Sequence, residues 1–118
     1  MIDGLDKLMQ FQTDALRLRS YRQELLSANI ANADTPNYKA VDFDFAQALD
    51  AAQSPAAASG GNTSPTLQYR VPAQSSLDGN SVEMDAERAK FADNTVRYEA
   101  AMRVLSAQIK TMLAAVQG

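Results

Sequence analysis

The feature that most constrains this chain is a row of large side chains, spaced seven residues apart, in its last third. The row consists of Met84, Phe91, Tyr98, Leu105 and Met112. Positions four residues further on carry Met102, Ile109 and Val116, but Arg88 and Thr95 at the first two places. Such a seam, sustained over about four heptads, is typical of coiled-coil packing. We predict a helix over residues 82–117, roughly 50 Å long at ~1.5 Å per residue. Asn80, Ser81 and Asp85 are all candidate caps.

A second long helix is predicted over residues 3–33. One row of apolar residues with 3–4 spacing contains Leu8, Phe11, Ala15, Leu18 and Leu25, and a neighbouring row contains Leu5, Met9, Leu16, Leu26 and Ile30. With Tyr21, the two rows cover an arc of roughly 240°, against the ~100° stripe that docks on one core. This helix therefore needs more than one neighbour. Arg19 and Arg22 fall inside the arc, and a solvated or snorkelling pair is favoured over a ligand site.

This helix is predicted to stop within Leu25–Tyr38. Asn29, Asn32 and Asp34 interrupt the apolar periodicity, and Pro36 forces the residue before it out of the helical region. Pro36 and Asn37 suit the centre of a tight turn, because asparagine tolerates a positive φ. Asn29 and Asn32 lie on one helical face. They indicate either bonding to a neighbouring backbone or helix, or merely a frayed helix end.

The middle of the chain predicts short extended segments and one short helix. Val41, Phe43 and Phe45 alternate with Asp42 and Asp44, which is the pattern of a strand, and a helical run follows over residues 46–52. We favour a solvated face for the two aspartates over a metal or acid–base pair, since no third ligand lies nearby.

The rest of the middle is turn-rich. Residues 54–65 are small or polar and predict a flexible loop, and residues 66–72 predict a short strand. Leu77-Asp78-Gly79-Asn80 is a turn signal with no partner strand after it.

Composition excludes several functions. The net charge of −3 is made of interspersed charges, which argues against a nucleic-acid partner or an anionic membrane. The chain has no cysteine and no histidine, so it lacks thiol chemistry and the commonest general base. We expect no cofactor, no metal and no membrane insertion, since no apolar run approaches ~20 residues. The N-terminus does not resemble a Sec-type signal peptide, which suggests a cytosolic protein or one exported by another route.

The predicted architecture is mainly α, in a single domain of residues 1–118. Residues 1–34 hold the N-terminal helix, 35–81 the turn, short β segments and loop, and 82–118 the C-terminal helix. The two helices are expected to form an antiparallel coiled coil. Because one partner cannot cover a 240° arc, we expect an isolated chain to be poorly ordered at its ends until many copies pack together.

The segment ANIANADTPNY, residues 28–38, resembles the Asn-Ile-Ala-Asn-x-x-Thr-Pro-Gly-Tyr signature of bacterial flagellar rod and hook proteins. The chain departs from it at Asn37, where the family usually has glycine. Residues 38–40, 42–45 and 79–85, with Asn94 and Tyr98, look most like proximal rod subunits. The resemblance covers roughly residues 1–50 and 78–118.

The resemblance implies a structural role in the basal body. Such proteins leave the cytoplasm through the flagellar type III apparatus and form the periplasmic rod that transmits motor torque, with their terminal helices in an inner coiled-coil layer. The implied partners are copies of the same chain, other rod proteins, and the ring-to-rod adaptor and export-gate proteins at the rod base. The resemblance places the motif in packing between subunits, at Asn29, Ile30, Asn32, Thr35, Pro36 and Tyr38.

Three alternatives remain open. A sibling rod protein shares most of these features. A soluble coiled-coil adaptor or export chaperone would use the seam between residues 91 and 116 as a ligand helix. An enzyme would depend on carboxylates alone, either Asp42 with Asp44 or Glu83, Asp85 and Glu87.

Overall fold

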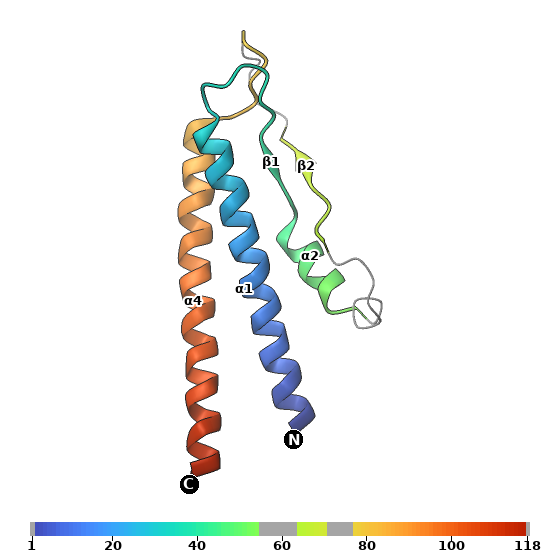
Figure 1. Cartoon of the computed structure of the whole chain (residues 1–118), viewed down its shortest axis with the longest axis vertical. Coiled ribbons are helices and arrows are strands. Elements are labelled where there is room, and N and C mark those ends of the chain that lie inside the picture. Colours follow the sequence, from blue (N-terminus) through green and yellow to red (C-terminus); the bar gives the residue numbers. More distant parts are fainter. Residues whose placement is uncertain (1, 55–63, 71–76, 118) are drawn as a thin grey trace.

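The computed structural model describes residues 2–54, 64–70 and 77–117. In chain order the elements are α1 (Ile2–Ala31), β1 (Val41–Asp42), α2 (Phe45–Ala52), β2 (Gln68–Tyr69) and α4 (Met84–Gln117). Helices α1 and α4 lie side by side and run antiparallel, with both chain termini at the same end of the molecule (Figure 1). The predicted mainly α fold, with long terminal helices packed on each other, is confirmed.

Elements β1, α2 and β2 form an arm that lies along α1, on the side away from α4 (Figure 1). The molecule is elongated, with extents of 63 × 29 × 18 Å. We call residues 20–42 and 77–98 the closed end of the helix pair, and residues 2–12 and 102–117 its open end. The axes of α1 and α4 diverge from the closed end toward the open end in Figure 1.

The apolar core lies between α1 and the arm. Leu18, Phe43 and Ala48 are buried there, and the Tyr21 ring stacks on that of Phe43 with centroids 5.7 Å apart. The Arg19 guanidinium lies 3.6 Å from the centre of the Phe45 ring. Phe43 and Phe45 therefore dock the arm on α1.

The strand at residues 39–45 is shorter than its alternation predicts. Asp44 caps α2, and its carboxylate accepts a hydrogen bond from the Gln47 N–H at 3.1 Å. Phe45 is therefore the first residue of α2 and not a strand residue. Asp44 is exposed, as expected, but the solvated position predicted for Asp42 is wrong, because that carboxylate is held by two arginines.

The second strand pairs with the strand that precedes it in the chain. β2 is antiparallel to β1, with Val41 opposite Tyr69 and Asp42 opposite Gln68. The turn at Asp78-Gly79 therefore closes no hairpin with a later strand among the described residues. The end of the predicted strand, residues 71–72, and most of the predicted loop, residues 55–63, lie outside the described residues.

The predicted caps of α4 are wrong. The helix begins at Met84, so Asp85 lies inside it and Glu83 flanks it. Asn80 and Ser81 come too early to cap it, and both are buried against the turn that follows α1.

Candidate functional site

Asn29 is the most connected residue of the motif. Its side chain is fully buried, and its amide nitrogen donates to the Val41 carbonyl at 2.9 Å and to Glu87 Oε2 at 3.0 Å. Its Oδ1 accepts from the Val41 N–H at 3.0 Å and from the Tyr38 hydroxyl at 3.3 Å. Because these partners belong to β1, the turn and α4, Asn29 joins three parts of the closed end. Of the two expectations for Asn29, bonding to neighbouring elements is the one observed.

Asn32 and Thr35 close the turn itself. Asn32 Nδ2 donates to the Ala28 carbonyl at 2.8 Å, and the Thr35 hydroxyl donates to Asn32 Oδ1 at 3.0 Å. The Tyr38 N–H then donates to the Thr35 carbonyl at 3.2 Å. Asn37 has a φ of 63°, so the left-handed conformation predicted for it is confirmed.

The turn at residues 77–80 is bonded to the turn that follows α1. Asn80 Nδ2 lies within hydrogen-bond distance of the carbonyls of Asn32, Ala33 and Thr35, at 2.9, 3.0 and 2.7 Å. These carbonyls belong to the turn that follows α1, and those of Asn32 and Thr35 also accept backbone N–H groups within that turn. Asn80 therefore holds the turn that follows α1 and does not cap the start of α4.

The backbone also joins the two turns. The Asn37 N–H donates to the Asp78 carbonyl at 2.8 Å, and the Ser81 N–H donates to the Tyr38 carbonyl at 2.9 Å. The Ser81 hydroxyl accepts from the Ala40 N–H at 2.7 Å. Gly79, with a φ of 74°, sits directly against the Asn37 side chain, where a Cβ would overlap Asn37 Oδ1.

Four charged side chains form a cluster beneath these turns. Arg22 makes a two-pronged contact with the Asp42 carboxylate at 2.9 and 3.0 Å. Arg70, from the arm, donates to Asp42 Oδ2 at 2.9 Å and places Nε 2.7 Å from Glu87 Oε1. This last contact is an ion pair without the alignment of a hydrogen bond. The cluster joins α1, both strands and α4, and it replaces the predicted snorkelling of Arg22.

The cluster shifts the pKa values of Asp42 and Arg22. Burial by itself raises the pKa of Asp42, but hydrogen bonds from Arg22, the Phe43 N–H and Arg70 outweigh it, so the pKa lies below its ordinary value. The hydrogen bond to Asp42 raises the pKa of Arg22. Both shifts favour the charged forms.

The contact between α1 and α4 at the closed end is polar. Asn94 is fully buried, and its Nδ2 donates to the Arg19 carbonyl at 2.9 Å and to Gln23 Oε1 at 2.7 Å. Gln23 Nε2 donates to the Thr95 hydroxyl at 2.6 Å. Glu87 and Asn94 lie seven residues apart and three after Met84 and Phe91, so the row beside the seam is polar. A search for apolar periodicity passes over them.

The predicted seam residues differ in how far they are buried. Leu18 is buried and Leu25 is half-buried, and Phe91, Tyr98, Leu105 and Met112 are also half-buried. Five residues of the prediction are exposed: Leu8, Phe11, Met102, Ile109 and Val116. All five belong to the open end.

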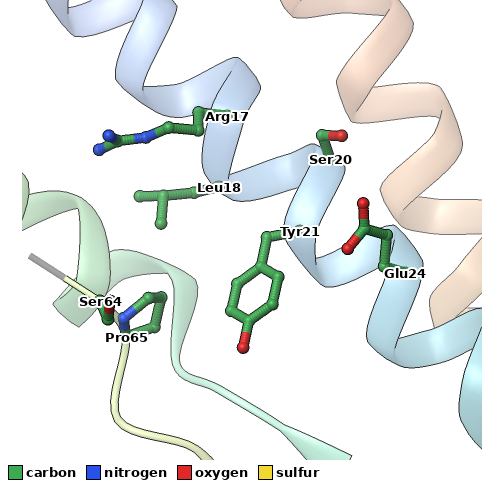
Figure 2. Close-up of a pocket in the computed structure, with 7 residues that line it drawn as sticks. All are labelled: Arg17, Leu18, Ser20, Tyr21, Glu24, Ser64 and Pro65. Atoms are coloured by element: carbon green, nitrogen blue, oxygen red, sulfur yellow. The ribbon is translucent and has the colours of Figure 1, made fainter.

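A hollow lies between α1 and the arm. It measures about 580 Å³, and Figure 2 shows Leu18 and Tyr21 projecting from α1 toward Ser64 and Pro65, with Arg17, Ser20 and Glu24 at its margin. Its lining includes one carboxylate, that of Glu24, and one guanidinium, that of Arg17. In the described ranges, no group of three or more acidic side chains could hold a metal ion, and no helix is long and apolar enough to cross a membrane.

Comparisons with known proteins identify the class of protein to which this chain belongs. Residues 9–39, which contain most of α1 and the turn, match the family described as flagella basal body rod protein. The similarity of named relatives extends over nearly the whole chain. A flagellar basal body rod protein FlgB from Escherichia coli K12 is 47% identical, with 99% of this chain and 98% of the relative covered.

Proteins of the same name from Salmonella typhimurium and Cereibacter sphaeroides are 44% and 41% identical. The alignments cover 100% and 98% of this chain, and 99% and 98% of the relatives. The chain therefore belongs to the flagellar basal-body rod proteins, and it is a structural subunit of the flagellar rod.

Proposed function

We propose that this chain is a subunit of the proximal rod and assembles with copies of itself and other rod proteins through the open end of its helix pair. It acts as part of a drive shaft that transmits motor torque, and it carries out no catalysis. The likeness to relatives named FlgB supports this assignment over a sibling rod protein.

One observation carries the assembly mechanism. Large apolar side chains are exposed along both helices of the open end: Leu5, Leu8, Phe11, Met102, Val104, Ile109, Leu113 and Val116. Val116 is 85% exposed and Leu113 is 53% exposed. Each Å² of apolar surface removed from water contributes about 25 cal/mol, so packing this end against neighbouring subunits stabilises the assembly. The open ends of the helix pairs therefore become ordered only where copies of the chain pack against one another.

A buried polar atom supports the same conclusion. Gln108 Oε1 lies buried in the open end and has no hydrogen-bond partner among the described residues. A buried carbonyl oxygen of this kind is normally paired. A donor from a neighbouring subunit would pair it.

The motif residues have two roles in this proposal. Asn29 and Asn32 hold the turn in shape, as their intramolecular bonds indicate. Thr35 and Pro36 are exposed at the tip of the turn, and Ile30 and Tyr38 are half-buried beside it. These four side chains are proposed to contact a neighbouring subunit.

The proposed location is the base of the periplasmic rod. The chain is proposed to leave the cytoplasm through the flagellar type III apparatus and to lie beside the ring-to-rod adaptor and the export gate. The motif resemblance and the names of the relatives support this location. Because the chain has no cysteine, single engineered cysteines at exposed positions such as Asp34 allow cross-linking to each neighbour in isolated basal bodies.

A charge introduced into the open end tests the assembly mechanism. Ile109→Asp should leave the helical circular dichroism of the purified chain unchanged but remove the chain from isolated basal bodies and abolish swimming. Ser106→Asp, at an exposed polar position of the same helix, is the matched control and should assemble normally. A swimming strain that carries Ile109→Asp, or a deletion of residues 106–118, as its only copy would overturn the proposal. A purified chain that forms a well-folded small oligomer would favour the adaptor alternative.

A further inference from the structure

We propose that the pair formed by Arg70 and Glu87 is a latch that makes the docking of the arm and the order of the first turns of α4 depend on each other. The proposal concerns the single chain and holds whatever its neighbours in the rod are.

The latch depends on where the two charges come from. Glu87 lies in the first turn of α4, and its side chain is 0% exposed. Arg70 directly follows β2 in the arm, and its backbone N–H donates to the Ala40 carbonyl at 2.8 Å. Arg70 is thus fixed to the arm by its main chain and reaches the helix by its side chain, which is 13% exposed.

Glu87 has few other partners. One oxygen contacts Arg70, and the other accepts from Asn29 Nδ2 at 3.0 Å. The other guanidinium of the cluster, Arg22, makes its short contacts with Asp42 rather than with Glu87. If β2 leaves with Arg70 while β1 stays in place, Arg22 remains bound to Asp42, and the Glu87 carboxylate keeps only the Asn29 amide as a close partner.

A buried carboxylate without a close counter-charge is strongly unfavourable, and a movement of the start of α4 that brings Glu87 into water relieves this cost. This movement would also break the contact of Glu87 with Asn29 and loosen the neighbouring turns. Conversely, unwinding the first turns of α4 leaves Arg70 with Asp42 alone. Such a coupling is reciprocal by thermodynamic necessity. A neighbour that binds the arm in place therefore stabilises the start of α4, and a neighbour that displaces the arm loosens it.

The test uses hydrogen exchange of the full-length chain. Arg70→Met keeps the length of the side chain but removes its charge. It should speed amide exchange by about tenfold or more at Val41 and Asp42 and also at residues 87–94 of α4, since a buried charge left unpaired costs at least this factor. Adding Glu87→Gln removes the unpaired charge. In the double variant, exchange at residues 87–94 should return to within about threefold of the original chain, while β1 remains fast.

Several outcomes would overturn the latch. One is an Arg70→Met chain whose exchange rises in β1 alone, because this is what a purely local role in the arm predicts. Another is a double variant whose α4 exchanges as fast as in the single variant. If Arg70→Met alone does not fold, the double variant must fold, and its failure to do so counts against the proposal.

Arg97→Met is the matched control. Arg97 also pairs with a carboxylate, Asp93, at 3.0 Å, but both side chains are more than half exposed. Exchange in this variant should stay within about threefold of the original throughout the chain, as expected for a surface pair.

Discussion

The closed end and the open end of the helix pair differ in which side chains they bury and which they expose. At the closed end, polar side chains such as Asn29, Glu87 and Asn94 are fully buried and bonded to other elements. At the open end, large apolar side chains such as Leu113 and Val116 are exposed. In a protein that worked alone, the reverse distribution would be expected, because burying apolar surface is the main source of stability.

The difference separates two tasks. Buried hydrogen-bonded groups contribute little net stability but tolerate only one geometry, since any other leaves a donor or acceptor unpaired. They therefore fix how the turn, the arm and the two helices are placed. Apolar contacts are stronger but not directional, and at the open end they are left for neighbouring subunits. The closed end sets the shape of the subunit, and the open end is proposed to join it to others.

The largest expected effect comes from removing the central amide of the closed end. Asn29→Ala leaves the Val41 amide and carbonyl without their partners and Glu87 with Arg70 alone. We expect a loss of about 3 kcal/mol in the free energy of unfolding, since each buried group left unpaired costs ~1–3 kcal/mol.

Urea unfolding measures this loss. Asn32→Ala is the control, because its hydrogen bonds are exposed, and it should lose no more than about 1 kcal/mol. Equal losses for the two variants would contradict the importance given to burial at the closed end.

Substitutions of Gly79 at the closed end and of Gly4 at the open end should have smaller effects on the free energy of unfolding. Gly79→Ala forces a side chain onto a positive φ and into Asn37, and it should cost about 1–2 kcal/mol. Gly4→Ala meets nothing within 4 Å. In a stable helix it would gain about 1 kcal/mol.

Because the open end of an isolated chain is expected to be poorly ordered, Gly4→Ala should change its stability by much less than this gain. Thermal unfolding of both variants measures the two effects. A full gain for Gly4→Ala in the isolated chain would show that the open end is already formed.

Acid should weaken the closed end through Asp42. The pKa of this group is lowered in the folded chain from its ordinary value of 3.8, so its contribution to stability is present above that value and is lost as the pH falls below it. Asp42→Asn removes this contribution. The difference in urea midpoint between the original chain and the variant should shrink between pH 6 and about pH 3. A difference that stays constant with pH would show that Asp42 does not titrate in this range.

Much of the fold is present in local sequence patterns. The apolar rows predict both helices, and Pro36 predicts where the first one ends. Asn37 has the left-handed conformation that its place in the turn requires. These predictions succeed because each depends on residues a few positions apart.

The polar site could not be predicted in the same way. Arg22, Asp42, Arg70 and Glu87 come together from α1, β1, the segment after β2 and α4, and no periodic pattern links charges so far apart in sequence. The sequence predicts Asn80 only as a cap for the helix that follows it, whereas its side chain bonds to the turn after the helix that precedes it. Glu87 and Asn94 repeat the seven-residue spacing of the seam, and this spacing is a weak signal for the polar row beside it.

The most direct test compares hydrogen exchange at the two ends of the isolated, dilute, full-length chain. Our account predicts strong protection of amides in residues 22–31 and 87–98, and fast exchange in residues 4–12 and 104–116, with the latter becoming protected in assembled rods. Strong and uniform protection of both ends in a monomer would contradict it.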